Sequence, residues 1–248
     1  MRKVIGTLLA FAAMPMAAGY AADMPLKAPP QIAAAVYSWT GFYLGGEIGG
    51  GWARETTTVL SLPAGGNPVG TVLNPVSLSG VLGGGYVGYN YQINQIVLGI
   101  DGYYDAAGLT GTGSDISATG NLLSHSDKMK WDSAITGRLG FANNNWLFFV
   151  KGGWAWAGFS GMTTNTTAGG AFAGTSTSSD TRDGGTVGAG IEYGFAQHWS
   201  AKLEYDYVKF RTATYNITSV TAAGVVTTPA RGTSSDLNEL KAGVAYHF

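Results

Sequence analysis

The sequence has no cysteine, and this absence excludes several classes of function. Without thiols the chain can form no disulfide, no thiolate metal site and no cysteine nucleophile. Charged residues make up only 12% of the chain, about half of the usual ~25%. Their signs nearly cancel, with 14 Lys and Arg against 15 Asp and Glu. The chain therefore lacks the basic surplus of a nucleic-acid-binding domain.

Long apolar runs are also missing after the N-terminal segment. No later stretch has the roughly 20 apolar residues that a helix needs to cross a bilayer. The chain is instead rich in glycine, with 39 residues, and in aromatic residues, at 12%. Many Gly, Tyr and Thr residues with few charges are typical of a β protein, including one whose outer face contacts lipid.

The first 22 residues are predicted to be a cleaved secretory signal peptide. Arg2 and Lys3 precede an apolar core, and small residues before Ala21 and Ala22 fit a cleavage site. Residues 23–37 are rich in proline and alanine and are predicted to be an extended periplasmic linker. Because no cysteine follows the cleavage site, a lipid-anchored lipoprotein is excluded. Residues 38–248 are predicted to form one domain.

In that domain the apolar pattern has a period of two, which indicates strands rather than helices. At the C-terminus, Leu240, Ala242, Val244, Tyr246 and Phe248 alternate with small or polar residues. Seven further segments alternate in the same way, and their lengths suit the ~9–11 residues of a strand that crosses a membrane. These segments are 41–52, 81–91, 95–105, 130–141, 146–159, 186–195 and 200–210.

The connectors between these segments have two lengths. The short ones are 91–94, 142–145 and 196–198, and the long ones, rich in Gly, Ser and Thr, are 54–79, 107–128, 160–181 and 212–236. This alternation is typical of an outer-membrane barrel. The predicted fold is all-β, an eight-stranded antiparallel up-and-down transmembrane β-barrel. Both chain ends would lie on the periplasmic side, and the four long connectors would be mobile external loops.

Charged residues fall on the register opposite to the apolar one, which places them inside the barrel. Buried charges must pair or they cost several kcal/mol each, so an ion-pair network is predicted in the lumen. A soluble lipocalin-type calyx would need the reverse pattern, with an apolar interior and a polar exterior. The predicted network consists of Glu47, Asp101, Asp132, Arg138, Lys151, Glu192, Lys202, Glu204, Asp206, Glu239 and Lys241.

Other residues are predicted at the two rims of the barrel. Aromatic rings near the tight turns suit a periplasmic girdle at the membrane interface. This girdle is predicted to contain Trp39, Phe42, Tyr91, Phe141, Trp146, Phe195 and Trp199. The charged outer rim, a candidate contact for lipopolysaccharide phosphates, comprises Arg54, Glu55, Asp105, Lys128, Lys130, Arg182, Asp183, Lys209 and Arg211.

Three stretches, 38–46 (SWTGFYLGG), 150–155 (VKGGWA) and 240–248 (LKAGVAYHF), carry a family resemblance, as does the N-terminus at 22–30. They resemble the small outer-membrane immunogenic, porin-like proteins of alphaproteobacteria. The resemblance implies an eight-stranded barrel in the Gram-negative cell outer membrane and a role as a surface antigen. It also implies that Tyr246 and Phe248 form the signal read by the outer-membrane assembly machinery.

The expected function is that of a non-enzymatic integral outer-membrane barrel, a structural and antigenic surface protein with at most small porin-like conductance. The alternatives are a small-solute diffusion porin, haem or other ligand binding through the external loops, and an enzyme sited at the rim. His125 is the candidate haem ligand. The glycine pattern at 83–88 lies inside a strand, so it is no nucleotide site. No catalytic, cofactor-binding or metal-binding residue is predicted, and the expected partners are outer-membrane lipid, lipopolysaccharide and the assembly machinery.

Overall fold

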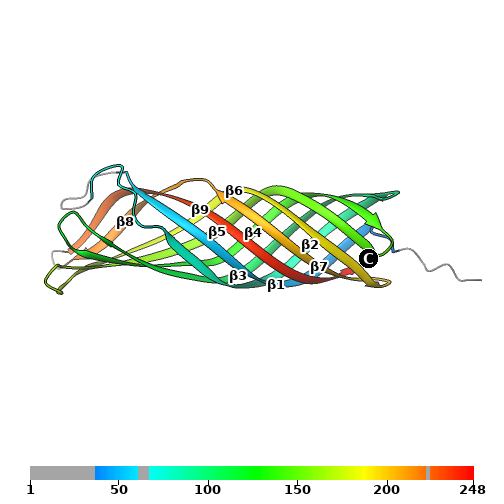
Figure 1. The fold of residues 1–248 in the computed structure, drawn as a ribbon, viewed down its shortest axis with the longest axis horizontal. Coiled ribbons are helices and arrows are strands. Elements are labelled where there is room, and N and C mark those ends of the chain that lie inside the picture. The colour runs from blue at the N-terminus through cyan, green and yellow to red at the C-terminus, as the bar shows by residue number, and fades with distance from the viewer. Residues whose placement is uncertain (1–36, 61–66, 222–223) are drawn as a thin grey trace, which may run out of the picture. The chain divides into compact units, whose positions relative to one another are not determined.

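The computed structural model describes residues 37–60, 67–221 and 224–248, which form one antiparallel sheet closed into a barrel (Figure 1). The predicted signal peptide and all but the last residue of the predicted linker lie outside these residues. No helix in the described part of the chain is long and apolar enough to cross a membrane. The strands are β1 (Gly41–Val59), β2 (Val76–Ile93), β3 (Ile96–Ile116), β4 (Leu122–Asn143), β5 (Trp146–Thr166), β6 (Phe172–Ala196), β7 (Trp199–Phe210), β8 (Ala213–Thr221) and β9 (Gly224–His247).

The nine strands occupy eight positions around the barrel. Each strand from β1 to β6 pairs with the next in sequence, and β1 pairs with β9 to close the ring. β7 pairs with the C-terminal half of β9, and β8 continues along the N-terminal half of the same strand. β7 and β8 are therefore one barrel strand interrupted at Arg211 and Thr212. The predicted eight-stranded barrel is confirmed.

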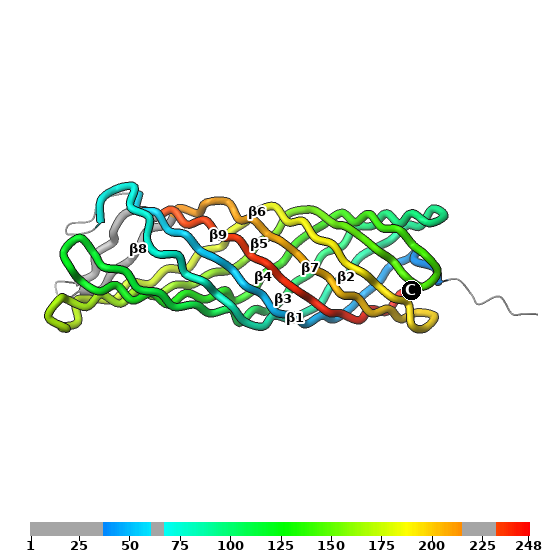
Figure 2. The backbone as a smooth tube through the Cα atoms, viewed as in Figure 1, coloured from blue at the N-terminus to red at the C-terminus, as the bar shows by residue number. Residues whose placement is uncertain are grey.

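The two ends of the barrel have different turns (Figure 2). At the tight-turn end, Asn94 and Asn144 adopt positive φ angles of 56° and 53°, which asparagine tolerates better than most residues. At the long-hairpin end, the β3–β4 turn closes with Gly120 at a φ of 80°, where its N–H donates to the Ser117 carbonyl at 2.9 Å. Glycine adopts this left-handed conformation without steric cost.

The prediction that the long connectors are irregular loops is wrong over most of the length of three of them, 107–128, 160–181 and 212–236, whereas 54–79 lies in described strands only at 54–59 and 76–79. β3 continues to Ile116 and β4 begins at Leu122, so five residues separate the two strands. β5 and β6 are likewise separated by five residues, 167–171. Threonine favours strands, and the continued ladders pair the backbone groups of these segments. The barrel wall thus extends far beyond the alternating segments.

Glycine on the inner wall makes room for tyrosine rings. Tyr43 lies opposite Gly88 in the β1–β2 register, and Tyr86 lies opposite Gly45. A Cβ atom at Gly88 would overlap the Tyr43 ring, and one at Gly45 would overlap the Tyr86 ring. The interior of an eight-stranded barrel is just wide enough for side chains to fill it, so large and small residues alternate between neighbouring strands.

Candidate functional site in the barrel lumen

All eleven residues of the predicted lumen network lie inside the barrel, each less than 8% exposed. Arg138 on β4 contacts Glu192 on β6, with an N–O distance of 2.5 Å. Lys151 on β5 bridges two carboxylates of β7, at 2.6 Å from Glu204 and 3.1 Å from Asp206. The alternating register of the strands thus brings charges together that are far apart in the sequence.

Lys241 on β9 is the centre of the most crowded part of this network. Its Nζ atom lies 3.1 Å from Asp206, 3.3 Å from Glu239, and 3.6 Å from both Glu47 and Asp105. It also lies 3.5 Å from the centre of the Tyr103 ring. One ammonium group therefore faces four carboxylates.

Two of the predicted network residues have no ion-pair contact of this kind in the described structure. Asp101 accepts hydrogen bonds from the Tyr43 hydroxyl, at 3.3 Å, and from the Thr136 hydroxyl. Asp132 is 1% exposed, and neither of its carboxyl oxygens has a hydrogen-bond partner among the described residues.

Three charged residues assigned to the outer rim lie inside the barrel instead. Asp105 is fully buried, and Glu55 and Arg182 are 6% and 4% exposed. Asp105 is four residues after Asp101 on β3, so both side chains point to the same face of the strand. The alternation in the sequence therefore already indicated that Asp105 points inward. The assignment was wrong because the strands continue past the expected rim, so that these residues are still surrounded by wall.

A layer of apolar side chains closes the lumen beyond the charged residues. Along β7 the inward residues Lys202, Glu204 and Asp206 are followed by Val208 and Phe210. The same change from charged to apolar occurs on the neighbouring strands. The layer includes Leu82, Leu109, Met129, Phe159, Phe210 and Leu237, each at most 3% exposed.

On the long-hairpin side of this apolar layer, a second group of polar residues fills the interior. Arg182 Nη1 lies 2.6 Å from Glu55 and 2.5 Å from the Ser235 hydroxyl. Its guanidinium group stacks 4.0 Å from the centre of the Phe159 ring. Burial raises the pKa of Glu55, and the charge of Arg182 opposes that rise.

The tight-turn mouth is filled by the segment that precedes β1, which corrects the prediction for Trp39. Trp39 is fully buried and does not belong to an outer girdle. Its ring packs 4.5 Å from Tyr37 and 5.7 Å from His247, and its backbone N–H donates to Gln92. The segment turns into the barrel because this mouth offers apolar contacts with Leu147 and other inner side chains.

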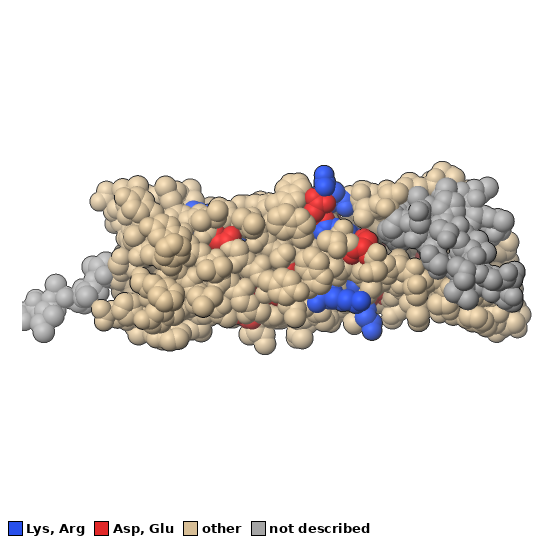
Figure 3. All heavy atoms as spheres, turned by 180° about the vertical axis from the view of Figure 1, so that it is seen from behind, with Lys and Arg blue, Asp and Glu red and all other residues tan. Residues whose placement is uncertain are grey.

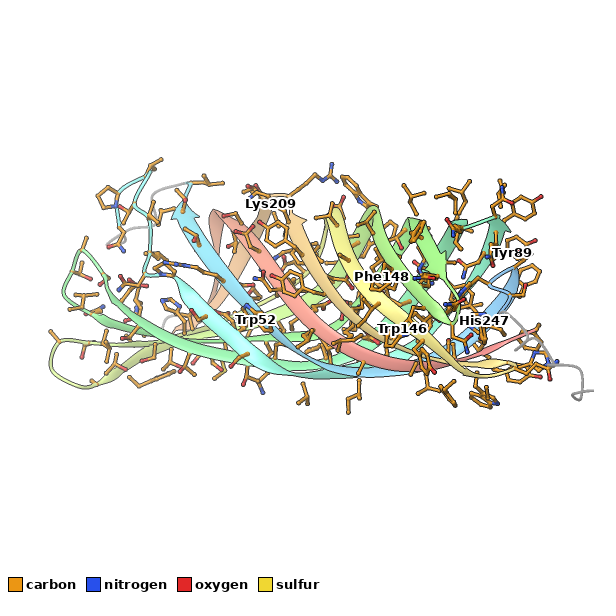
Figure 4. All side chains as sticks on the ribbon, turned by 45° about the vertical axis from the view of Figure 1, so that its right-hand side comes forward. Trp52, Tyr89, Trp146, Phe148, Lys209 and His247 are labelled. Carbon is orange, nitrogen blue, oxygen red and sulfur yellow. The ribbon has the colours of Figure 1, made fainter. Side chains whose placement is uncertain are left out.

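The other predicted girdle residues point outward from the wall. Their exposed fractions range from 44% at Trp146 to 62% at Phe42. Figure 4 shows Tyr89, Trp146 and Phe148 in the part of the barrel nearest the tight turns. The outward residues of the predicted girdle are Phe42, Tyr91, Phe141, Trp146, Phe195 and Trp199.

A second aromatic row and a charged band lie farther along the outer wall. The row consists of Trp52, Tyr104, Trp154 and Tyr205, all more than 40% exposed. Beyond it, Lys209 pairs with Asp236 at 3.1 Å. Figure 3 shows most of the visible Lys and Arg side chains gathered in one band of the surface, and Figure 4 shows Lys209 on the outside of the wall.

One exposed contact in this band has a clear electrostatic effect. Arg211 donates to Asp183 at 2.6 Å, and the indole N–H of Trp154 donates to the same carboxylate at 3.0 Å. The hydrogen bond from Arg211 lowers the pKa of Asp183.

His125 is held by protein groups on both sides of its ring. Nδ1 lies 3.0 Å from the Thr163 hydroxyl, and Nε2 lies 3.2 Å from Asp115. The side chain is 9% exposed, so its geometry does not favour haem coordination. Within the described ranges, no group of three or more His, Cys, Asp or Glu residues is arranged to hold a metal ion.

The wall, apolar outside and charged inside, is that of an outer-membrane barrel. The family model of the outer membrane protein beta-barrel domain matches residues 7–248. The chain belongs to this family. The predicted location in the Gram-negative outer membrane is thereby confirmed.

Relatives support the same assignment. The 31 kDa outer-membrane immunogenic protein of Brucella melitensis is 30% identical over 213 residues, covering 84% of this chain and 86% of that protein. The 22 kDa outer membrane protein of Rhizobium leguminosarum is 28% identical, covering 85% and 79%. Among solved structures, the outer membrane protease OmpT of Escherichia coli aligns over 86% of this chain and 98% of its own, with a TM-score of 0.45 and 9% identity. That last likeness carries no conclusion about activity.

Proposed function

We propose that this protein is a structural, surface-displayed barrel of the outer membrane, without catalytic activity and with at most a small conductance. The filled lumen is the observation that supports this proposal. From the tight-turn mouth, the Tyr37–Trp39 segment, the charged layer and the apolar layer follow one another along the interior. Opening a passage would require the separation of buried ion pairs, and breaking one such pair costs about 3–5 kcal/mol.

Single-channel recording in a planar bilayer tests this proposal. The purified wild-type barrel should give no current steps, or small ones. Lys151→Ala should raise the conductance, because it removes a cation that holds Glu204 and Asp206 across the lumen. Lys209→Ala, which alters only the outer wall, is the matched control. Large and stable steps from the wild-type protein would contradict the proposal and favour a general diffusion porin.

The long-hairpin end is proposed to face the cell exterior. Its hairpins are rich in Ser, Thr and Gly, so the wall there is suited to water on both faces. The relatives from Brucella are named immunogenic proteins, which supports a role of this end in surface display. Antibodies raised against a peptide of residues 110–126 should bind intact cells, and binding only after lysis would contradict the orientation.

Lipopolysaccharide is the proposed partner of the charged band. Five basic side chains point outward in or near it, next to the aromatic row: Arg54, Lys128, Lys130, Lys209 and Arg211. Anionic lipid phosphates complement this charge. Replacing Lys128 and Lys130 together by Gln should reduce the lipopolysaccharide retained during purification, whereas Thr112→Ala should not. Equal retention by all three proteins would contradict this partner.

The assembly machinery is the proposed partner of the C-terminal aromatic residues. Phe248 is 72% exposed, its ring lies 5.2 Å from that of Tyr246, and its N–H donates to the Phe42 carbonyl where β9 meets β1. Deletion of Phe248 should lower the fraction of protein that reaches the heat-modifiable folded form in cells. An unchanged folded fraction would contradict this role.

A further inference from the structure

The charged layer of the lumen has a surplus of acidic groups that its bases do not balance. Among the described residues, eight carboxyl groups lie there with four Lys and Arg side chains. Protonation of His247, which lies 3.4 Å from Glu192, would add one positive charge. A surplus of three or four negative charges cannot remain uncompensated in a water-poor interior, because burying an unpaired charge is costly. The groups are Glu47, Asp101, Asp105, Asp132, Glu192, Glu204, Asp206 and Glu239 against Arg138, Lys151, Lys202 and Lys241.

The surplus is concentrated around Asp132. Asp132 on β4 lies directly opposite Asp105 on β3 in the strand register. Directly opposite residues of neighbouring antiparallel strands have Cβ atoms about 4.5–5.5 Å apart, so these two inward carboxyl groups lie side by side. Both side chains are at most 1% exposed, and none of their four carboxyl oxygens has a hydrogen-bond partner among the described residues.

The neighbouring cations cannot neutralise this group. Lys241 already faces Asp206 and Glu47 as well as Glu239 and Asp105, and an ammonium group has three N–H bonds for these four carboxylates. Lys151 is directed to Glu204 and Asp206. The remaining titratable neighbour is the buried hydroxyl of Tyr103. A phenol is neutral at physiological pH, so it adds no positive charge.

We propose that Asp132 and Asp105 share a proton in the closed barrel, so that the lumen holds a bound proton at neutral pH. Two ionised carboxylates are both pure acceptors and repel each other at this separation. One proton turns the contact into a hydrogen bond between a carboxyl group and a carboxylate. A metal ion would need several converging oxygen ligands, which the described residues do not provide.

The bound proton makes folding depend on pH. An unfolded chain releases this proton at neutral pH, so the folded state binds one proton more than the unfolded state. The folding equilibrium constant should therefore fall by about tenfold for each unit that the pH rises above neutrality, for each proton held in this way. This inference does not depend on whether the barrel conducts ions, so a conducting wild-type barrel would overturn the proposed function and leave the shared proton in place.

Infrared spectroscopy of the folded protein tests the proposal, because a protonated carboxyl group absorbs at a carbonyl frequency separate from that of a carboxylate. The folded wild type should show this band at pH 7. Asp132→Asn should weaken it, since the amide donates to Asp105 without a proton from solution, and Asp105→Asn should do the same if the first variant fails to fold. Asp236→Asn, on the outer wall, is the control and should leave the band unchanged.

The pH dependence of unfolding gives a second readout. The temperature at which the folded gel band disappears should fall from pH 7 to pH 10 in the wild type and fall less in Asp132→Asn. Absence of the protonated band at pH 7, or equal band intensity in the wild type and Asp132→Asn, would overturn the proposal. Unfolding that responds to sodium or potassium concentration and not to pH would overturn it in favour of a bound metal cation.

Discussion

Arg138 illustrates how a single residue stabilises the lumen. Its guanidinium group contacts Glu192 at 2.5 Å and lies 3.7 Å from the centre of the Phe149 ring. The side chain is 5% exposed, so both the charge pair and the cation–π contact are shielded from water. Such a pair is expensive to break because the remaining partner stays buried.

Arg138→Ala should therefore destabilise the barrel by about 3–5 kcal/mol, since it leaves Glu192 without its main partner. Arg211→Ala breaks the exposed pair with Asp183 and should cost much less, because water screens that pair. Urea unfolding of both variants, followed by tryptophan fluorescence in detergent micelles, measures the difference. Equal losses for the two variants would show that the lumen pair is not buried as described.

Gly88 tests the fit of large and small residues inside the wall. Gly88→Ala places a methyl group against the Tyr43 ring and should cost about 1–3 kcal/mol through overpacking. Gly185→Ala adds the same methyl group where no atom lies within 4 Å. It should be neutral or slightly stabilising. The two unfolding midpoints, compared with the wild type, decide between tight packing at Gly88 and a lumen with spare room.

At the scale of strands, the alternating pattern correctly predicts strands near the tight turns. At the long-hairpin end it predicts loops where the structure has strands. Alternation is visible where one face is apolar and the other is charged, as in Lys202–Glu204–Asp206 against Leu203 and Tyr205. Past the aromatic row, hydroxyl-bearing residues suit both faces of the wall, so the alternation disappears although the strands continue. Ser and Thr in residues 107–116 therefore resemble a loop in sequence and form a paired strand in the structure.

Trp39 shows a different limit of prediction at this scale. An aromatic residue beside the first strand is typical of an interfacial girdle, and its sequence neighbours do not distinguish the two positions. Its burial depends on contacts with Leu147 and His247, which come from other strands. Only the closed barrel brings these residues together, so local sequence could not reveal the filled mouth.

Protease digestion of intact cells tests the extent of the strands. Lys128 and Lys130 lie within β4, which pairs with β3 and β5 on its two sides. Trypsin should leave the bond after Lys128 intact, because this residue pairs with Thr110 and Ser160 and a paired strand does not fit a protease cleft. Proteinase K should instead cut within the turns at 117–121 or 167–171. Rapid tryptic cleavage after Lys128 would restore the interpretation of this segment as an external loop.

At the scale of the whole molecule, the barrel combines a membrane-facing apolar wall with an interior closed in successive layers. Ion pairing, apolar packing and the segment at the mouth each reduce the space for solutes. The sequence could predict the charged layer because its residues share one register. It could not predict the whole apolar layer on the long-hairpin side, since Leu109, Met129 and Leu237 lie outside the alternating segments.

The accessibility of single cysteines tests the closed lumen most directly, because the natural chain has no cysteine to interfere. Ala134→Cys places a thiol inside the barrel, where the side chain is 2% exposed. Ser114→Cys places one at an exposed position of the long β3–β4 hairpin. A small charged thiol reagent should label Cys at 114 rapidly in the folded protein and label Cys at 134 only after heating unfolds the barrel. Labelling of both positions at similar rates before heating would contradict a closed lumen.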